Sequence, residues 1–121
     1  MSQNGINKVR LMGNLGRNPV LRYTQNQIPV ANFSLATNES WTDKETGEQK
    51  QRTEWHNIVA WKKHAEVCAE YLHKGSKVEI DGRLQTRDYT VMVDGKEQPR
   101  RVTEIILTDV KFLGARKVTQ E

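Results

Sequence analysis

The sequence is poor in the residues that build disulfides and metal sites. Cys68 is the only cysteine among 121 residues, which excludes an intrachain disulfide and a cysteine-rich zinc site. We interpret Cys68 as a small buried residue on a helix, because an unpaired cysteine packs well as a small apolar side chain. The spacing of His56, His64 and His73 places them on different elements or on opposite sides of one helix. We therefore expect no metal and no cofactor.

Long apolar runs are also missing. No stretch approaches the roughly 20 residues that cross a bilayer, and the N-terminus lacks the basic-then-apolar order of a secretion signal. Hydrophobic residues make up 36% of the chain and the mean hydropathy is −0.78, so the core has to be small. We expect a cytoplasmic protein with no membrane partner, built as one domain because 121 residues are too few for two ordinary ones.

The short motifs of common enzyme classes do not occur in the sequence. It contains no GxSxG, no HExxH, no GxxxxGK[ST] phosphate loop and no CxxC. The acidic residues are scattered among lysines and arginines, and the stretch "TDKETGEQK" is typical of a solvated loop, not of an acid–base pair. We therefore expect that the protein is not an enzyme.

Alternating and helical patterns divide the chain into strands and one helix. Strand-like alternation occurs in "INKVRLMGNL", "VANFSLATNES", "TEWHNIVAW", "KVEIDGRLQTRDYTVMV" and "RRVTEIILTDVKFLG". From Lys62 the period changes, because Ala65, Cys68 and Leu72 fall at helical spacing. "DGK" at 94–96 predicts a hairpin turn between the last two strands. The polar stretch "WTDKETGEQKQR" fits either a long hairpin arm or a flexible loop.

This order predicts a fold. Five short strands with a helix between the third and fourth are typical of the OB-fold, a five-stranded Greek-key barrel whose sheet face and loops bind oligonucleotides or oligosaccharides. The fold class is therefore all-β with one helix, with residues 1–114 as the OB-fold domain and 115–121 as a short polar C-terminal tail. The predicted core is formed by Phe33, Leu35, Ile58, Leu84, Ile105 and Leu107, and the aromatics Tyr71 and Phe112 are assigned to packing.

The stretch "TEWHNIVAW" combines two of the three tryptophans in one strand. Side chains of a strand alternate between faces, so Trp55 and Trp61 share one face and His56 lies on the other. Two tryptophans on one face are either core or a platform for a flat ligand. We favour the platform, because the apolar residues named above already supply a core.

Basic residues surround these aromatics in a chain with 19 Lys and Arg against 15 Asp and Glu, a formal net charge of +4 and a pI near 9.3. Proteins that bind single strands without sequence preference combine a positive groove with aromatic side chains on which bases stack. Trp41, which opens the charged stretch, and Tyr89, late in the fourth strand, add to Trp55 and Trp61. The pattern predicts binding of single-stranded nucleic acid, although so mild a positive charge does not by itself establish a polyanionic partner.

Several blocks resemble the bacterial single-stranded DNA-binding protein family. They are "NKVRLMGNLGRNPVLRY", "VANFSLATNESW", "TEWHNIVAW", "AEYLHKGSKVEIDGRLQTRDY" and "MVDGKEQPRRVTEIIL", and together they cover about 6–114. The resemblance implies an OB-fold homotetramer wrapped by single-stranded DNA, acting in DNA replication, recombination and repair in the bacterial cytoplasm, in association with the nucleoid.

The resemblance also implies roles for individual residues. His56 matches a histidine at a subunit interface, which agrees with its place on the other strand face. The positions that match DNA-stacking aromatics are Trp41, Trp55, Trp61 and Tyr89. The positions that match basic DNA contacts are Lys8, Arg22, Lys44, Lys63, Lys74 and Arg87.

The sequence departs from the family pattern at several positions. Tyr89 replaces a common tryptophan and Trp61 a common phenylalanine, and both keep an aromatic ring. Asn57 replaces a usual arginine and Asp88 a usual basic residue, which removes phosphate contacts, while Arg10 replaces a usual aliphatic. The family normally carries a flexible tail with an acidic, apolar tip that recruits replication and repair proteins. The sequence stops at Glu121 without one, which fits either a truncated chain or a short accessory version, for example from a mobile element. Replication and repair proteins stay possible partners, but these residues contain no recruiting tail.

Two other functions are compatible with parts of the sequence. An OB-fold assembly module that binds mainly a protein partner would explain the lost basic positions. A nuclease on an OB-fold would need a carboxylate cluster with a metal, and the sequence offers none.

Overall fold

The computed structural model of the protein describes residues 5–114, and strands dominate it. The elements are, in chain order, β1 (Val9–Leu15), β2 (Val20–Tyr23), β3 (Pro29–Thr42), β4 (Gln49–Trp61), α1 (Lys63–Tyr71), β5 (Lys77–Val93) and β6 (Lys96–Phe112). The predicted class, all-β with one helix, is confirmed. The predicted tail at 115–121 lies outside the described residues, as do residues 1–4.

Five of the strands close into a barrel. β1, β5, β6, β4 and β3 pair in that order, and β3 returns to pair with β1 at Asn14 and Leu15. The β4–β6 pair, at Ile58 and Val59, is parallel, and the other pairs are antiparallel. The short strand β2 pairs with β3 outside the closed ring. The helix lies between the third and fourth barrel strands in chain order, so the predicted OB-fold is confirmed.

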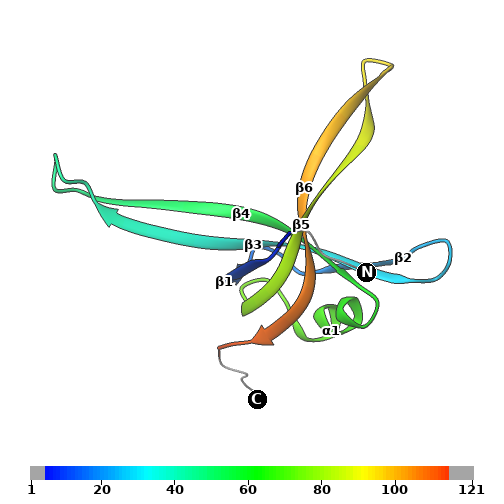
Figure 1. Ribbon diagram of the computed structural model, residues 1–121, viewed down its shortest axis with the longest axis horizontal. Coiled ribbons are helices and arrows are strands. Elements are labelled where there is room, and N and C mark those ends of the chain that lie inside the picture. Colours follow the sequence, from blue (N-terminus) through cyan, green and yellow to red (C-terminus); the bar gives the residue numbers. More distant parts are fainter. Residues whose placement is uncertain (1–4, 115–121) are drawn as a thin grey trace.

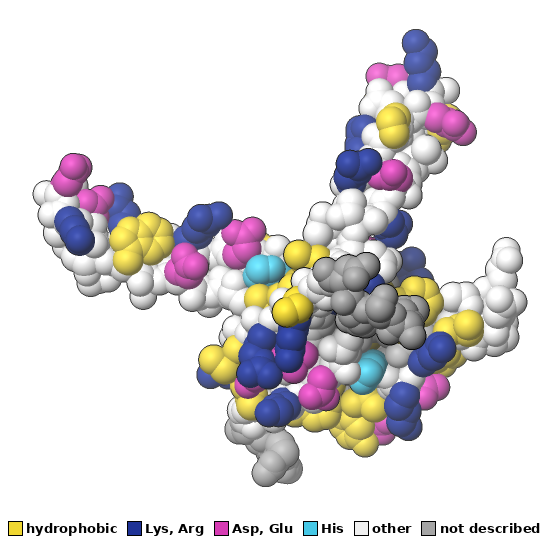
Figure 2. Space-filling view, viewed as in Figure 1, with side chains coloured by type: hydrophobic (Ala, Val, Ile, Leu, Met, Phe, Trp, Pro, Cys, Tyr) yellow, Lys and Arg dark blue, Asp and Glu magenta, His cyan; other side chains and the backbone are white. Residues whose placement is uncertain are grey.

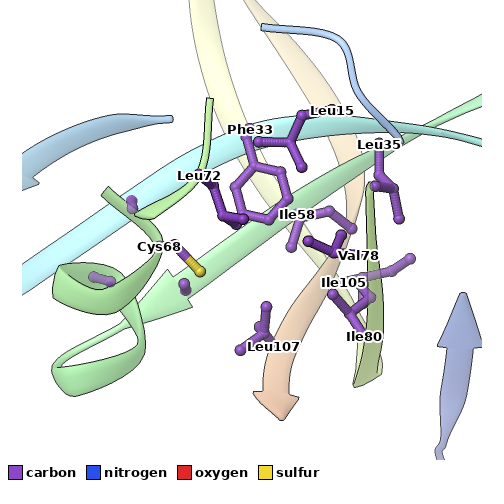
Figure 3. Packing of buried hydrophobic residues seen from close by; sticks show 13 residues of the cluster. Leu15, Phe33, Leu35, Ile58, Cys68, Leu72, Val78, Ile80, Ile105 and Leu107 are labelled. Carbon is purple, nitrogen blue, oxygen red and sulfur yellow. The ribbon is translucent and has the colours of Figure 1, made fainter. Parts of the chain in front are cut away.

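The core fills the barrel and the space beneath α1. Phe33 and Leu35 of β3, Ile58 of β4, and Val78 and Ile80 of β5 are fully or almost fully buried and converge in the barrel (Figure 3). Burial of each side chain of this size stabilises the fold by about 1.5–3 kcal/mol. Phe33, Leu35 and Ile58 were predicted from strand alternation, and these predictions are confirmed.

One predicted core residue lies on the surface instead. The alternation along β5 predicts that Leu84 points inward like Val78 and Ile80, but its side chain is half exposed. The register of β5 on β6 shifts between Asp81 and Gly82, and residues 83–90 are all exposed. β5 therefore leaves the barrel at this point, and the inward direction no longer leads into a core.

Two hairpins project far beyond the barrel (Figure 1). β3 and β4 stay paired as far as Thr42 and Gln49, and β5 and β6 as far as Val93 and Lys96. We call these hairpins the β3–β4 arm and the β5–β6 arm. The stretch "WTDKETGEQKQR" thus forms most of an arm, with a turn at 43–48. Both arms are exposed outside the barrel, because a two-stranded ribbon has no second layer to cover it.

The helix α1 packs on the barrel with one face. Its Ala65 and Cys68 are completely buried, which confirms the interpretation of Cys68 as a core residue. At its end, the ring of Tyr71 lies 5.9 Å from that of Phe112, so these aromatics pack on each other, but both are about half exposed. Within the part of the chain that the structure describes, no helix is long and apolar enough to cross a membrane.

Candidate nucleic-acid interface

The two tryptophans of β4 lie on the outside of the barrel. Ile58 and Ala60 point into the core, and Trp55 and Trp61 point the other way, as the alternation predicts. Trp55 is 58% exposed and Trp61 is 40% exposed. Neither is a core residue, which leaves the platform as the interpretation of this face.

The same face continues from β4 across β6 to β5. Val59 pairs with Ile106, and Ile106 pairs with Arg83. Paired residues of neighbouring strands point to the same side of a sheet. Arg87 and Tyr89 follow Arg83 at even spacing, so they share this side, and Tyr89 is 41% exposed.

On the other side of β4, the face extends to β2. Val30 of β3 pairs both with Trp61 of β4 and with Arg22 of β2, so these three residues form one row across the sheet. The side chains of Arg22 and Trp61 are two strands apart, which is roughly 10 Å. We call the surface that carries Arg22, Trp55, Trp61, Arg87 and Tyr89 the outer face.

A glycine fixes the position of the Trp55 ring. A Cβ atom added to Gly16 would overlap Cζ3 of Trp55 and would come within 2.9 Å of Cη2. No side chain therefore fits between the Gly16 backbone and the edge of the ring that carries Cζ3 and Cη2. Trp55 is still 58% exposed, so much of the indole is accessible to solvent.

Trp41 does not join the outer face. The register between β3 and β4 is continuous from Thr42 to Val30, and it places Trp41 on the same side as Thr37 and opposite Trp55. Trp41 is 46% exposed on the β3–β4 arm. The structure thus brings together three of the four predicted aromatics, and a DNA contact of Trp41 remains a prediction for a separate surface.

The side that carries Trp41 leads into a groove beside β1. His56 lies in this groove, half-buried, with its Nε2 3.0 Å from Oγ1 of Thr37. The groove has a volume of about 410 Å³ and is lined by Arg10, Leu11, Met12, Thr37, Glu39, Arg52, Glu54 and His56. We call it the His56 groove. It contains both acidic and basic side chains.

The six predicted basic contacts differ in how their charges are balanced. Lys8 precedes β1, Arg22 lies on β2, Lys44 in the turn of the β3–β4 arm, Lys63 at the start of α1 and Lys74 in the loop before β5. Within residues 5–114, none of these five has an acidic group within 4.0 Å, whereas Arg87 does. The five unpaired charges are free to attract phosphate.

Arg87 is held by a residue that the sequence reasoning missed. Both carboxylate oxygens of Glu104 accept hydrogen bonds from the Arg87 guanidinium, at 3.0 and 3.1 Å, and these bonds raise the pKa of Arg87. The Cζ atom of Arg87 lies 5.5 Å from the ring centroid of Tyr89. The turn at 94–96 could have predicted this pair. It sets the hairpin register, which places Gln85 opposite Glu104, and Arg87 lies two residues from Gln85 on the same side of β5.

Two of the positions that depart from the family pattern, Arg10 and Asp88, form ion pairs of their own. Arg10 donates a hydrogen bond to Asp81 at 2.9 Å and lies 3.6 Å from Glu79, so its charge is balanced locally. The hydrogen bond from Arg10 lowers the pKa of Asp81. Asp88 accepts a hydrogen bond from Arg101 at 2.9 Å on the opposite side of the β5–β6 arm from Arg87.

Charge on the molecule is mixed. Figure 2 shows basic and acidic side chains following one another along both arms, with apolar groups between them. Across the described range 5–114, no three or more His, Cys, Asp or Glu side chains gather where they could hold a metal ion. The chemistry that the outer face offers is therefore stacking on aromatic rings and attraction by separate cationic side chains.

Comparison with known proteins agrees with this arrangement. A model of the single-strand binding protein family matches residues 6–113. Among solved structures, a similar one is the Plasmodium falciparum SSB in complex with ssDNA, with 38% sequence identity and a TM-score of 0.79. The alignment covers 94% of this chain and 100% of that chain. The family points to a non-enzymatic DNA-binding protein. Because the match spans nearly all of the sequence, the chain belongs to the single-strand binding protein family.

Proposed function

We propose that the protein binds single-stranded DNA without catalysis and without regard to sequence. The observation that carries the proposal is the outer face, where Trp55, Trp61 and Tyr89 present open rings on one continuous surface. Every base has a π-face, so stacking on such rings tolerates any sequence and contributes about 1–3 kcal/mol per base.

Phosphate attraction supplements the stacking. Arg22 lies in the row of Trp61, and Lys63 follows Trp61 by two residues at the start of α1. Both charges lack an acidic partner among the described residues, so counterions that they displace from DNA are released on binding. We expect the affinity to fall steeply as the salt concentration rises, since each phosphate contact with a single strand contributes about −0.7 to the slope of log affinity against log salt.

The biological role that follows is coating of unwound DNA. Such a protein protects single strands during replication, recombination and repair, in the cytoplasm of a bacterium and in association with its nucleoid. The proposal draws support from the family membership and from a surface that offers only cationic side chains for phosphates and aromatic rings for bases, as sequence-tolerant coating requires.

We further propose that copies of the chain assemble, as a homotetramer, through the His56 groove. The groove lies on the opposite side of the sheet from Trp55, so an assembly contact there leaves the outer face accessible. Its mixed charges fit a second copy better than they fit a polyanion. In this arrangement Trp41 lies beside the subunit contact, where DNA that passes between subunits can reach it.

Titration with oligo-dT tests the function. Stacking on Trp55 and Trp61 quenches tryptophan fluorescence, and the apparent Kd rises steeply between low and moderate salt. Trp55→Ala lowers the affinity while the circular dichroism spectrum stays unchanged, because the side chain is exposed. The absence of quenching at low salt contradicts the proposal, and tight binding of a partner protein without DNA binding supports the assembly-module alternative.

A further inference from the structure

Glu104 is the one charged residue within residues 5–114 that is buried, at 7% exposure. A buried carboxylate is costly unless it is paired and hydrogen-bonded. Both of its oxygens are satisfied by Arg87, one by Nε at 3.0 Å and the other by Nη2 at 3.1 Å. Two parallel bonds of this kind fix the plane of a guanidinium as well as its position.

The fixed guanidinium in turn lies against an aromatic ring. Its Cζ atom is 5.5 Å from the centroid of Tyr89, within the range where a cation and a ring attract each other. Glu104 therefore orients Arg87, and Arg87 restricts the ring of Tyr89. The three residues lie on the outer face, with Glu104 on β6 and the other two on β5.

Arg87 keeps hydrogen-bonding capacity on its solvent side. A guanidinium has five N–H donors, and Glu104 occupies one on Nε and one on Nη2. Within the described part of the chain, no acceptor bonds Nη1, and the Arg87 side chain is 52% exposed. The outer edge of the guanidinium can therefore bind a phosphate while its inner edge stays on Glu104.

We propose that Glu104 is a positioning residue for single-stranded DNA, holding Arg87 and Tyr89 so that a base stacks on the ring while Arg87 binds the adjoining phosphate. The inference rests on the proposed function, because it needs DNA on the outer face. Its physical basis is preorganisation: side chains that are already ordered lose less entropy when a ligand binds. Without Glu104, Arg87 and Tyr89 would have to be ordered by the DNA itself.

The direction in which one substitution changes the affinity for DNA shows whether Glu104 positions its neighbours or only repels phosphate. Glu104→Gln keeps the size of the side chain and removes a negative charge near the outer face. If Glu104 only repelled phosphate, the variant would bind DNA more tightly. If it positions Arg87 and Tyr89, the variant binds more weakly, by about three- to tenfold, which is part of what removing a stacked ring costs.

The matched control is Glu97→Gln. Glu97 is an exposed residue of β6 near the tip of the same arm, and no hydrogen bond or ion pair joins it to Arg87. This variant makes the same charge change and should bind oligo-dT as tightly as the parent or slightly more tightly. Parent, control and Glu104→Gln are compared by fluorescence titration at one salt concentration, with circular dichroism and thermal melts to verify folding.

A double-mutant cycle shows whether the effect passes through the ring. In a Tyr89→Ala background, Glu104→Gln should have a smaller effect on oligo-dT binding, because only the phosphate contact of Arg87 is left to position. An abasic oligonucleotide of equal length gives the same answer without a second substitution: it keeps the phosphates and lacks the bases, so the variant should differ from the parent less on this strand than on oligo-dT. A merely structural role of Glu104 would weaken binding to the same extent in every one of these comparisons.

Two further variants keep the test valid if Glu104→Gln does not fold. Glu104→Asp retains the charge and shortens the reach to Arg87, and Arg87→Lys retains the positive charge and loses the planar pair. Both should weaken oligo-dT binding without a change of net charge. Equal or tighter binding by folded Glu104→Gln, or an undiminished effect in the Tyr89→Ala background, overturns the inference. Failure of the parent itself to bind oligo-dT overturns the proposed function instead.

Discussion

The side-chain amide of Asn7 pairs with both backbone groups of Leu84. Its Nδ2 donates to the Leu84 carbonyl oxygen at 2.9 Å, and its Oδ1 accepts from the Leu84 backbone N–H at 2.9 Å. Leu84 is the residue that Asn7 would face if the pairing of Val9 with Gly82 continued by two positions. The side chain thus replaces a rung of the ladder where β5 leaves the barrel.

We predict that Asn7→Ala loosens the root of the β5–β6 arm. The substitution removes two exposed hydrogen bonds, so the free energy of unfolding should fall by about 1 kcal/mol. Amide hydrogen exchange at Leu84, followed by NMR, should become faster. Asn26→Ala in the loop after β2 is the control, since Asn26 is exposed and makes no such bond. Unchanged exchange at Leu84 would show that β6 alone orders this segment.

A second prediction concerns Gly16 and the ring of Trp55. Gly16→Ala adds a Cβ where the indole lies and within 2.8 Å of Oγ of Ser34, so the ring has to move and the hydroxyl has to turn away. The Gly16 backbone itself is outside the left-handed region, so its conformation suits alanine. The affinity for oligo-dT should fall by up to the 1–3 kcal/mol that one stacked base contributes. The emission maximum of Trp55 should shift in the free protein, because the side chain leaves its glycine contact.

Gly5→Ala is the matched control for this measurement, because a Cβ at Gly5 meets nothing within 4 Å. It should bind oligo-dT like the parent. If Gly16→Ala also binds like the parent while the Trp55 emission shifts, then the position of this ring does not determine the affinity, and the stacking role of Trp55 is wrong.

Local patterns predicted the barrel better than they predicted the arms. Alternation separated Trp55 from His56 because β4 is half-buried, and a buried face is what alternation reports. The prediction that Leu84 is a core residue was wrong because the sequence does not show where a strand leaves its barrel. The face of Trp41 also stayed hidden, since it depends on unbroken pairing of β3 with β4 through a polar stretch that fitted a loop equally well.

The Arg87–Glu104 pair illustrates a different limit. The turn at 94–96 sets the hairpin register, so the two residues could have been placed one step apart on one side of the arm. The burial of Glu104 could not have been predicted, because it depends on where β6 pairs with β4, at Ile106 of β6 and Val59 of β4. Contacts between elements that are distant in sequence decide which charge is solvated and which is held.

A third prediction follows from the burial of Cys68, which raises the pKa of its thiol from its ordinary value near 9 to about 11. The folded state then binds this proton more strongly than the unfolded state does. The corresponding stability is fully present below about pH 9 and is lost as the pH rises towards 11.

Urea denaturation of the parent and of Cys68→Ala at several pH values checks this prediction. The stability gap between the two proteins should shrink between pH 9 and 11 by on the order of 2 kcal/mol. Lysine and tyrosine titrations affect both proteins and cancel in the comparison. Thiol reagents should modify native Cys68 slowly at neutral pH, since a buried thiol is protonated and inaccessible. A gap that stays constant with pH would mean that the thiol titrates normally in the folded protein.

The last prediction concerns assembly through the His56 groove. His56→Ala removes the contact with Thr37 and leaves a gap in a surface that also contains Arg10 and Glu54. If copies meet there, the solution mass measured by light scattering or analytical ultracentrifugation should fall at low protein concentration. The few interface residues whose truncation costs more than about 1 kcal/mol cluster at the centre of an interface, and His56 lines the groove itself. Oligo-dT short enough to occupy one outer face should bind each chain as before.

His64→Ala on α1, outside the groove, is the control. An unchanged mass of His56→Ala at every concentration, equal to that of the control, would exclude this groove as the contact that holds copies together.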